Sequence, residues 1–192
     1  MPVDSRLVGL TKDGRIVGAP ADADGYVRIG GAPPMHAYHK RRVAAAGDYA
    51  AGDMISNSAT AASATAWKLK MGRDAGDTGH ITSVWVSASV DSLTTAPHVY
   101  LFAREPDRTD TPFTDNAAFA IGARALEYYC GRITLPGLRD DGSVSHAMTT
   151  NLQHPYRTDD AGYLWAILVA STAEANESAN MTVLLGMSGY VD

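Results

Sequence analysis

The amino-acid sequence predicts an all-β protein, a jelly-roll-like β-sandwich with an extended N-terminal arm and at most one short helix. Three observations lead to this class. Short segments alternate apolar and polar residues, turn-forming Gly, Pro and Asp separate these segments at short intervals, and only one stretch favours a helix. A chain of 192 residues with 45% apolar content is long enough for one sizeable core.

Residues 1–48 are expected to form the arm and residues 49–192 the sandwich body. Gly and Pro recur in the first segment, and "GGAPPM" interrupts any longer element. The pieces "TKDGRIVG" and "ADADGYVRIG" share Asp-Gly followed by apolar residues, which predicts two small hairpins or added edge strands. Ribbons this short rarely stand alone, so we expect them to lie against the body or against another subunit.

The net charge of −5 is divided unevenly along the chain. Residues 1–44 hold seven Lys or Arg against four Asp, a net charge of +3, which leaves −8 for the remainder. An acidic body repels nucleic acid, whereas a basic arm suits an acidic protein surface or the body of a neighbouring copy. The alternative is that "HKRR" is a solvated turn. The cations proposed to bind a partner are Arg28, Lys40, Arg41 and Arg42.

The first part of the body combines a loop with a strand. "NSATAASATA" at 57–66 consists almost entirely of Ala, Ser and Thr, so we expect a loop or a closely packed backbone. From Trp67 to Met71 apolar residues alternate with lysines, which predicts a strand. "GRDAGDTG" at 72–79 is expected to form the turn that follows.

Two strands are predicted in the middle of the chain. Residues 81–90 place Val and Ala on one face and Ser with Trp85 on the other. "HVYLFARE" at 98–105 is apolar on both faces, so we expect a central strand, and the proline-rich "EPDRTDTP" ends it. Trp85 shares its face with serines, which marks it as a candidate exposed aromatic for binding sugar or a partner protein.

The second half contributes one helix and four strands. "AFAIGARALEYYCGRITLP" predicts a short helix to about Tyr129 and then a strand. "SHAMTTNLQHPY" at 145–156 is a weak strand. "GYLWAILVAS" at 162–171 is a strongly apolar, buried strand, and "MTVLLGMSGYV" at 181–191 is the last one.

An ordered set of short motifs carries a resemblance to a known family. The motifs are "YAAGD" at 49–53, "ITSVWVSASV" at 81–90, "PHVYLFAREP" at 97–106, "DNAAF" at 115–119, "YCGRITL" at 129–135 and "GYLWAILVAS" at 162–171. In order and spacing they resemble a family of tailed-bacteriophage virion proteins, over about residues 49–192. The chain departs from the family pattern at Ala103-Arg104, where an Asp is usual, and at Tyr156, where Phe or Leu is usual.

The resemblance implies a structural virion protein that decorates or cements the outside of a capsid. Its implied partners are the major capsid protein and copies of itself in a homotrimer, at the capsid surface, after assembly in the host cytoplasm. The alternative is a tail or head-fibre module that binds a receptor or glycan near Trp85. An enzyme with converging carboxylates is the third hypothesis, and we expect no enzyme.

The "DNAAF" motif is expected to be a packing device. Asp115 and Asn116 can bond their own backbone in a tight turn, while Phe113 and Phe119 hold the loop on the sandwich. The alternative is an N-cap that begins a helix at Ala117.

The residues give little sign of metal, cofactor or catalytic chemistry. Cys130 is the single cysteine and is expected to be a buried, unreactive thiol. His36 and His39 are the only histidines close in sequence, and "DADG" at 22–25 and "DDG" at 140–142 suit turns as well as calcium. No common nucleotide, zinc or serine-nucleophile motif is present. We therefore expect no cofactor and no metal.

Neither a membrane nor a secretory signal is expected. No run approaches the ~18 consecutive apolar residues that a membrane helix requires. The first residues, "MPVDSRLVGLTKDG", contain an acid and no apolar core of a signal peptide.

Overall fold

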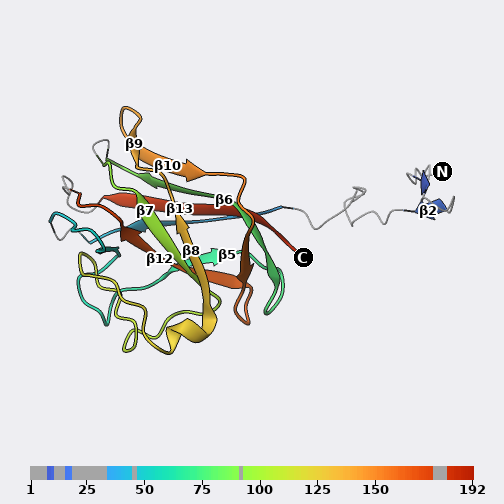
Figure 1. Cartoon of the computed structure of the whole chain (residues 1–192), viewed down its shortest axis with the longest axis horizontal. Helices are drawn as coiled ribbons and strands as arrows, with labels where there is room; N and C mark the ends of the chain where they lie inside the picture. The colour runs from blue at the N-terminus through green and yellow to red at the C-terminus, as the bar shows by residue number, and fades with distance from the viewer. Residues whose placement is uncertain (1–7, 11–15, 19–33, 45–46, 91–92, 175–180) are drawn as a thin grey trace, which may run out of the picture. The chain divides into compact units, whose positions relative to one another are not determined.

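Two antiparallel sheets face each other across one core in the computed structural model (Figure 1). The structure describes residues 8–10, 16–18, 34–44, 47–90, 93–174 and 181–192. The chain divides into two units, Met1–Pro33 and Pro34–Asp192. The sheets belong to the second unit.

The first unit contains one described hairpin. Strands β1 (Val8–Leu10) and β2 (Ile16–Gly18) pair antiparallel, with Val8 opposite Gly18. This confirms the ribbon predicted around "TKDGRIVG". The second predicted ribbon, at 21–30, lies outside the described residues.

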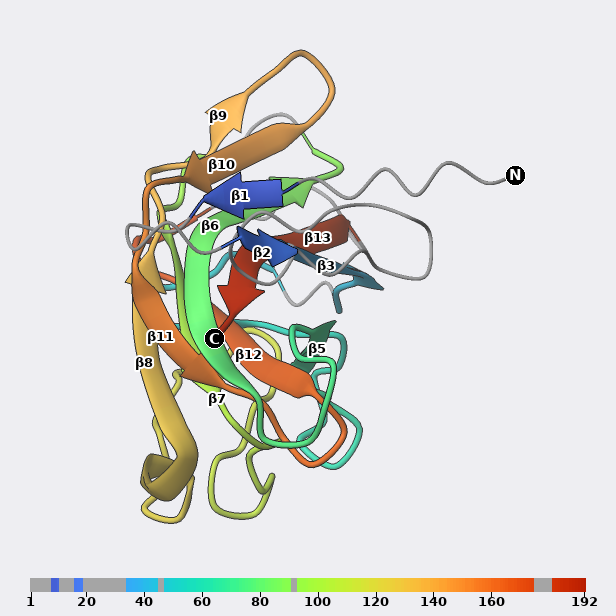
Figure 2. The same ribbon diagram turned by 90° about the vertical axis from the view of Figure 1, so that its right-hand side faces the viewer.

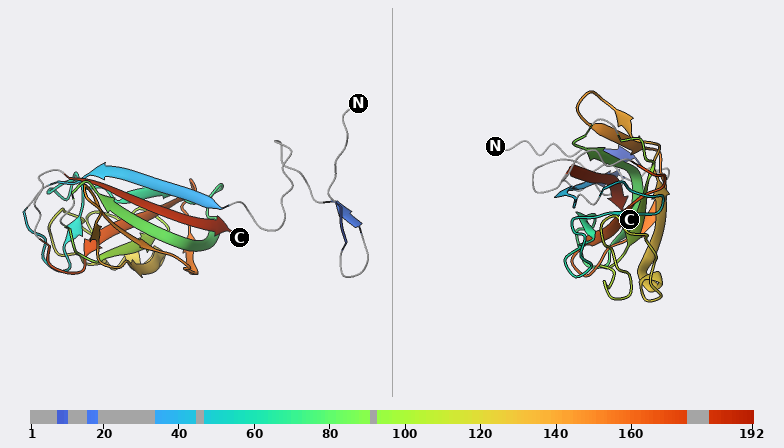
Figure 3. Two further views of the ribbon diagram at one scale, coloured as in Figure 1. Left: turned by 90° about the horizontal axis from the view of Figure 1, so that it is seen from above. Right: turned by 90° about the vertical axis from the view of Figure 1, so that its left-hand side faces the viewer.

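The larger sheet has six strands. Its order is β3-β13-β6-β10-β9, and β11 pairs with β6 beyond the end of β10. The left view of Figure 3 shows β3, β13 and β6 side by side along the body. The strands are β3 (Met35–Arg42), β6 (Thr78–Ala88), β9 (Arg139–Asp140), β10 (Ser145–Thr149), β11 (His154–Arg157) and β13 (Thr182–Val191).

The smaller sheet has five strands around β12. Its order is β4-β12-β7-β8, and β5 pairs with β12 on the same side as β4. The strands are β4 (Met54–Ile55), β5 (Trp67–Lys70), β7 (Pro97–Phe102), β8 (Tyr129–Thr134) and β12 (Tyr163–Ala170).

This strand order is that of a jelly roll. We count β4 with β5 and β10 with β11 each as one interrupted strand and leave out the two-residue β9. The eight strands from β3 to β13 then lie in the order 1-8-3-6 in one sheet and 2-7-4-5 in the other. The predicted all-β sandwich is therefore confirmed. The one helix of the described residues is the 3-10 turn η1 (Ala125–Tyr128), at the place predicted for a short helix. The weak strand predicted at 145–156 is two strands, β10 and β11.

Part of the segment predicted as an arm belongs to the sandwich. Residues 35–42 form β3, which pairs with β13 over its whole length, from Met35 opposite Gly189 to Arg42 opposite Thr182. The boundary predicted at residue 48 is therefore too late for this strand. The strand was not predicted from "HAYHKRR" because its inward-facing side chains include His39 and Arg41, where a strand pattern normally shows apolar residues.

The core lies between the sheets and follows the alternation of the strands. Trp67 and Leu69 of β5 and Val84 and Val86 of β6 are almost fully buried, as the period of two predicted. A second apolar cluster lies on the outer side of the smaller sheet, where loops cover Phe102 and Ile167. This cover explains why "HVYLF" and "LWAILV" are apolar on both faces.

The two sheets are also joined by histidine bonds where their edge strands meet. At β3 and β5, His39 Nδ1 donates to the carbonyl of Lys68, 3.0 Å away. At β11 and β8, which lie side by side in Figure 2, His154 Nε2 donates to the carbonyl of Cys130 at 2.8 Å. Burial lowers the pKa of His39, whereas the bond to the Lys68 carbonyl acts in the opposite direction because it stabilises the charged ring as a donor.

The "DNAAF" segment is a packing device, as predicted, but by a different set of bonds. The buried carboxylate of Asp115 accepts from the Ser56 backbone N–H at 2.7 Å and from the Tyr49 hydroxyl at 3.0 Å. Asn116 adopts a left-handed conformation with φ 53°. Phe113 is buried in the second cluster. No helix begins at Ala117, whose carbonyl instead accepts from Met54 N–H.

Removal of residues 1–33 is expected to leave a cooperatively folded body, whereas removal of residues 1–44 is expected to abolish it. The longer deletion removes β3, so the apolar residues that β3 covers are exposed and β13 becomes an edge strand. Urea unfolding followed by far-ultraviolet circular dichroism measures both variants. A cooperative transition in the longer deletion would contradict the placement of β3 in the body.

Asp115 is expected to make the stability of the protein depend on pH. Burial raises the pKa of Asp115 from 3.8 to about 6, so the folded state holds the proton more tightly than the unfolded chain does. This contribution is complete below about pH 4 and is lost as pH rises through about 6.

The measurement compares the wild type with Asp115→Asn, which does not titrate. The free energy of unfolding of the wild type should fall relative to the variant between about pH 4 and pH 6. Urea titrations at a series of pH values give both profiles. If the profiles run parallel, Asp115 does not titrate as described.

Candidate interaction surface

The outward-facing side of the six-stranded sheet brings together three of the residues predicted to bind a partner. Strand alternation places Tyr38, Lys40 and Arg42 of β3 on this side, opposite the buried Ala37 and Arg41. Trp85 of β6 lies on the same side, between the inward-facing Val84 and Val86. We call this side the outer face.

An apolar row crosses the outer face from edge to edge. In register across four strands lie Tyr38 of β3, Gly186 of β13, Trp85 of β6 and Met148 of β10. Tyr38 is 71% exposed and Met148 is 51% exposed. Large apolar side chains with this exposure are rare in the described part of the chain, where Leu126 is the other example. The row is therefore an apolar strip across the outer face.

Gly186 holds the indole of Trp85 close to the sheet. A Cβ atom at this position would overlap the indole of Trp85, so the glycine leaves the space that the ring fills. As a result Trp85 is half-buried on the outer face, rather than standing free as its serine neighbours suggested. A ring held flat offers contact area at little cost in side-chain entropy.

The β3 side of the outer face is cationic. The side chains of Lys40 and Arg42 are exposed, and no ion pair among the described residues engages either of them. Lys40 begins a second cross-strand row, next to Leu184 of β13. β3 is the last strand of the sheet on this side, so its cations lie along an edge.

Arg41 points inward, away from the outer face, and stabilises the fold. Its side chain is 8% exposed and donates to the carbonyls of Thr65 and Ala66, the second at 2.6 Å. The guanidinium also lies over the indole of Trp67, 4.5 Å from the ring centroid. Burial lowers the pKa of Arg41 to about 10, so the group remains charged at neutral pH. The geometry therefore removes Arg41 from the set of partner-binding candidates.

One predicted binding residue remains to be placed, and three residues of the outer face were not predicted. Arg28 lies outside the described residues. Tyr38, Leu184 and Met148 were not predicted for the outer face, although Tyr38 alternates with Lys40 and Arg42. Reading 35–42 as a strand would have found Tyr38, whereas the other two depend on strand pairing.

The described residues contain no group of three or more His, Cys, Asp and Glu that could hold a metal ion. His36 bonds Ser188 Oγ at 2.8 Å on one face of β3, and His39 lies on the other face, so the two do not converge. In "DDG", Asp140 Oδ1 accepts from Gly142 N–H at 2.8 Å, which is a turn contact. "DADG" at 22–25 lies outside the described part of the chain. Within the described part, no helix is long and apolar enough to span a membrane.

Comparisons with known proteins find similarity among solved structures. No protein-family model matches the chain, and no curated protein matches it. Among solved structures, a chain titled "Cyanophage Pam1 capsid asymmetric unit" is similar with 14% sequence identity, over 95% of this chain and 97% of that chain, at a TM-score of 0.34.

Arg41 and Arg42 form a matched pair for testing the two sides of β3. Arg41→Ala should lower the free energy of unfolding by about 2–4 kcal/mol, because two buried carbonyls lose a charged donor. Arg42→Ala should change it by less than about 0.5 kcal/mol, since the side chain is exposed. Urea unfolding gives both values. Equal effects of the two substitutions would contradict the opposite placement of these arginines.

Proposed function

We propose that this protein is a structural component of a tailed-bacteriophage virion and binds the outside of the capsid as a decoration or cement protein. The resemblance of residues 49–192 to phage virion proteins points to this class. The outer face of the six-stranded sheet is the observation that carries the proposal, because its composition is that of a protein interface. Binding alone is the expected chemistry.

The outer face has the composition and shape that suit a protein partner. Protein interfaces are enriched in Tyr, Trp, Met and Arg, and the outer face presents Tyr38, Trp85, Met148 and Arg42. The apolar row lies across the sheet, while exposed Lys40 and Arg42 mark its β3 edge. A partner with an apolar strip beside an acidic patch would complement both features.

We assign the major capsid protein and copies of this chain as partners, with a homotrimer as the assembly. A single weak contact is poorly suited to holding a protein on a capsid shell that is under internal pressure. Several copies joined by closed symmetry raise the effective concentration of each contact. The place of action is then the capsid surface, reached by assembly in the host cytoplasm.

The N-terminal unit contributes strands rather than positive charge. Residues 1–33 contain four Lys or Arg and four Asp, a net charge of zero. The excess of positive charge predicted for the arm comes from Lys40, Arg41 and Arg42, which belong to β3. We propose that residues 1–33 extend onto a capsid subunit or a neighbouring copy, where a segment such as the β1–β2 hairpin can add to a sheet edge.

The same outer face supports the alternative function, a tail or head-fibre module that binds a receptor or glycan. The observation in its favour is the fixed indole of Trp85, since flat, immobile aromatic rings suit saccharides as well as proteins. The two functions differ in the number of copies that each virion carries.

Copy number in purified virions tests the choice between the two functions. A stained gel that compares this protein with the major capsid protein should give copies on the order of hundreds if the protein covers the shell. About a dozen copies or fewer would favour a tail or fibre position. Absence from the purified particles would contradict both functions.

Charge reversal on the outer face tests the proposed surface itself. Lys40→Glu with Arg42→Glu should reduce attachment to capsids that lack the protein by about tenfold or more, because two attractive contacts become repulsive. The control reverses two exposed arginines elsewhere, Arg73→Glu with Arg124→Glu, and changes the net charge equally. Co-sedimentation of each purified variant with capsids measures attachment. Equal loss in both double variants would refute a specific role for the outer face.

A further inference from the structure

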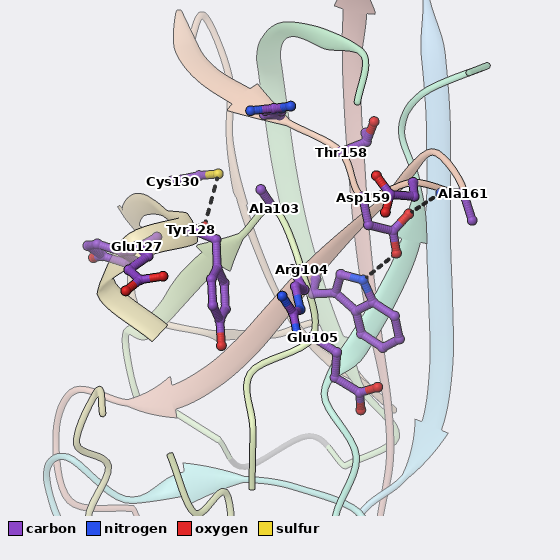
Figure 4. Close-up of a pocket in the computed structure, with 13 residues that line it drawn as sticks. Ala103, Arg104, Glu105, Glu127, Tyr128, Cys130, Thr158, Asp159 and Ala161 are labelled. Atoms are coloured by element: carbon purple, nitrogen blue, oxygen red, sulfur yellow. Dashed lines mark hydrogen bonds between the residues drawn. The ribbon is translucent and has the colours of Figure 1, made fainter. Parts of the chain in front are cut away.

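A cavity of about 700 Å³ lies at the five-stranded sheet, away from the outer face. Four segments meet around it, as Figure 4 shows: the end of β7, the turn η1 with the start of β8, the loop after β11, and β12. Its size is within the ~300–1,000 Å³ typical of small-molecule sites.

The aromatic wall of this cavity is fixed in place. Trp165 Nε1 donates to Asp159 Oδ2 at 2.8 Å, a bond visible in Figure 4. The other oxygen of Asp159 accepts from the backbone N–H groups of Ala161 and Tyr163, each at 2.8 Å. Lys68 Nζ lies 4.9 Å from the centroid of the indole and is not part of the cavity wall. Trp165 is therefore held by its neighbours before any ligand arrives.

The polar groups around the cavity carry both signs of charge. Arg104 and Arg157 contribute guanidinium groups, and Glu105, Glu127 and Asp160 contribute carboxylates. Arg104 lies over the ring of Tyr128, 5.7 Å from its centroid, and Glu105 pairs with Arg108 at 3.6 Å. Arg104, Glu127, Arg157 and Asp160 are exposed. Planar donors and acceptors thus surround an aromatic surface.

This combination selects among ligand classes. A phosphate or carboxylate ligand would face more carboxylates than guanidinium groups. A cation at the aromatic wall would be repelled by Arg104, whose guanidinium already lies over the Tyr128 ring. A purely apolar ligand would displace water from these exposed polar groups without replacing its hydrogen bonds. A neutral ligand with many hydroxyl groups can accept from Arg and donate to Glu or Asp at once.

We propose that this cavity binds a neutral saccharide. The apolar face of a sugar ring packs against Trp165. Hydroxyls of the saccharide bond the guanidinium of Arg104 and, on the other side of Tyr128, the carboxylate of Glu127. The site is separate from Trp85, which lies on the other sheet, so the proposal adds a binding activity to capsid decoration and does not depend on it.

Fluorine NMR of the full chain labelled with 5-fluorotryptophan tests the proposal. The three tryptophans give three signals, and Trp165→Phe and Trp85→Phe identify two of them. The probes are neutral mono- and oligosaccharides of glucose, galactose, mannose and N-acetylglucosamine, each titrated separately. We expect at least one of them to shift the Trp165 signal and leave the Trp85 signal in place.

Substitutions in exposed wall residues locate the binding. Arg104→Ala and Glu127→Ala should each weaken the affinity for that saccharide by about tenfold, while Arg73→Ala, an exposed arginine outside the cavity, should not change it. Urea unfolding confirms that the variants are folded. In the NMR titration, the proposal is overturned if no neutral saccharide shifts the Trp165 signal or if the Trp85 signal responds instead. In the affinity measurements, it is overturned if sialylated probes bind more tightly than neutral ones or if both wall variants bind the saccharide as the wild type does. Co-sedimentation of Arg104→Ala with capsids tests the decoration proposal separately. If this variant loses saccharide binding but still attaches to capsids, the two activities are independent.

Discussion

The pairing of β3 with β13 is the constraint on which the remaining architecture depends. It joins Tyr38 to Gly186 across most of the chain, and it places β13 between β3 and β6. It also sets the direction of each side chain of β3, because a shift of one residue would exchange the two faces. In the observed register Arg41 reaches the carbonyls of Thr65 and Ala66, while Lys40 and Arg42 reach solvent.

Local patterns were enough to predict most of the strands. Strands β5, β6 and β12 were predicted from the alternation in 67–71 and 81–90 and from the apolar run at 162–171. These predictions succeeded because the order of apolar and polar residues along a strand shows whether one or both of its faces are buried. β3 was missed for the opposite reason. Its inward-facing Arg41 is stabilised by two backbone carbonyls and by the Trp67 ring, all from a distant part of the chain. The residues next to Arg41 in the sequence do not indicate these partners.

The candidate surface was predicted in separate pieces and for separate reasons. Lys40 and Arg42 were selected as cations of an arm, and Trp85 as an aromatic among serines. Their common face follows from strand pairing, as does the addition of Met148 from β10. The cavity beside Trp165 was not predicted, since it requires four segments to converge. Sequence patterns reveal which face of a strand is buried, but they do not reveal which strands are neighbours.

The central position of β13 has a consequence for the synthesis of the protein. The six-stranded sheet cannot be completed until residue 191 has left the ribosome, because β3 and β6 are joined only through this strand. Until then the edges of β3 and β6 that face each other lack the strand that pairs with both of them. Contacts between segments so distant in sequence also form slowly. Before β13 is in place, the unpaired edges of β3 and β6 are open to pairing with another chain.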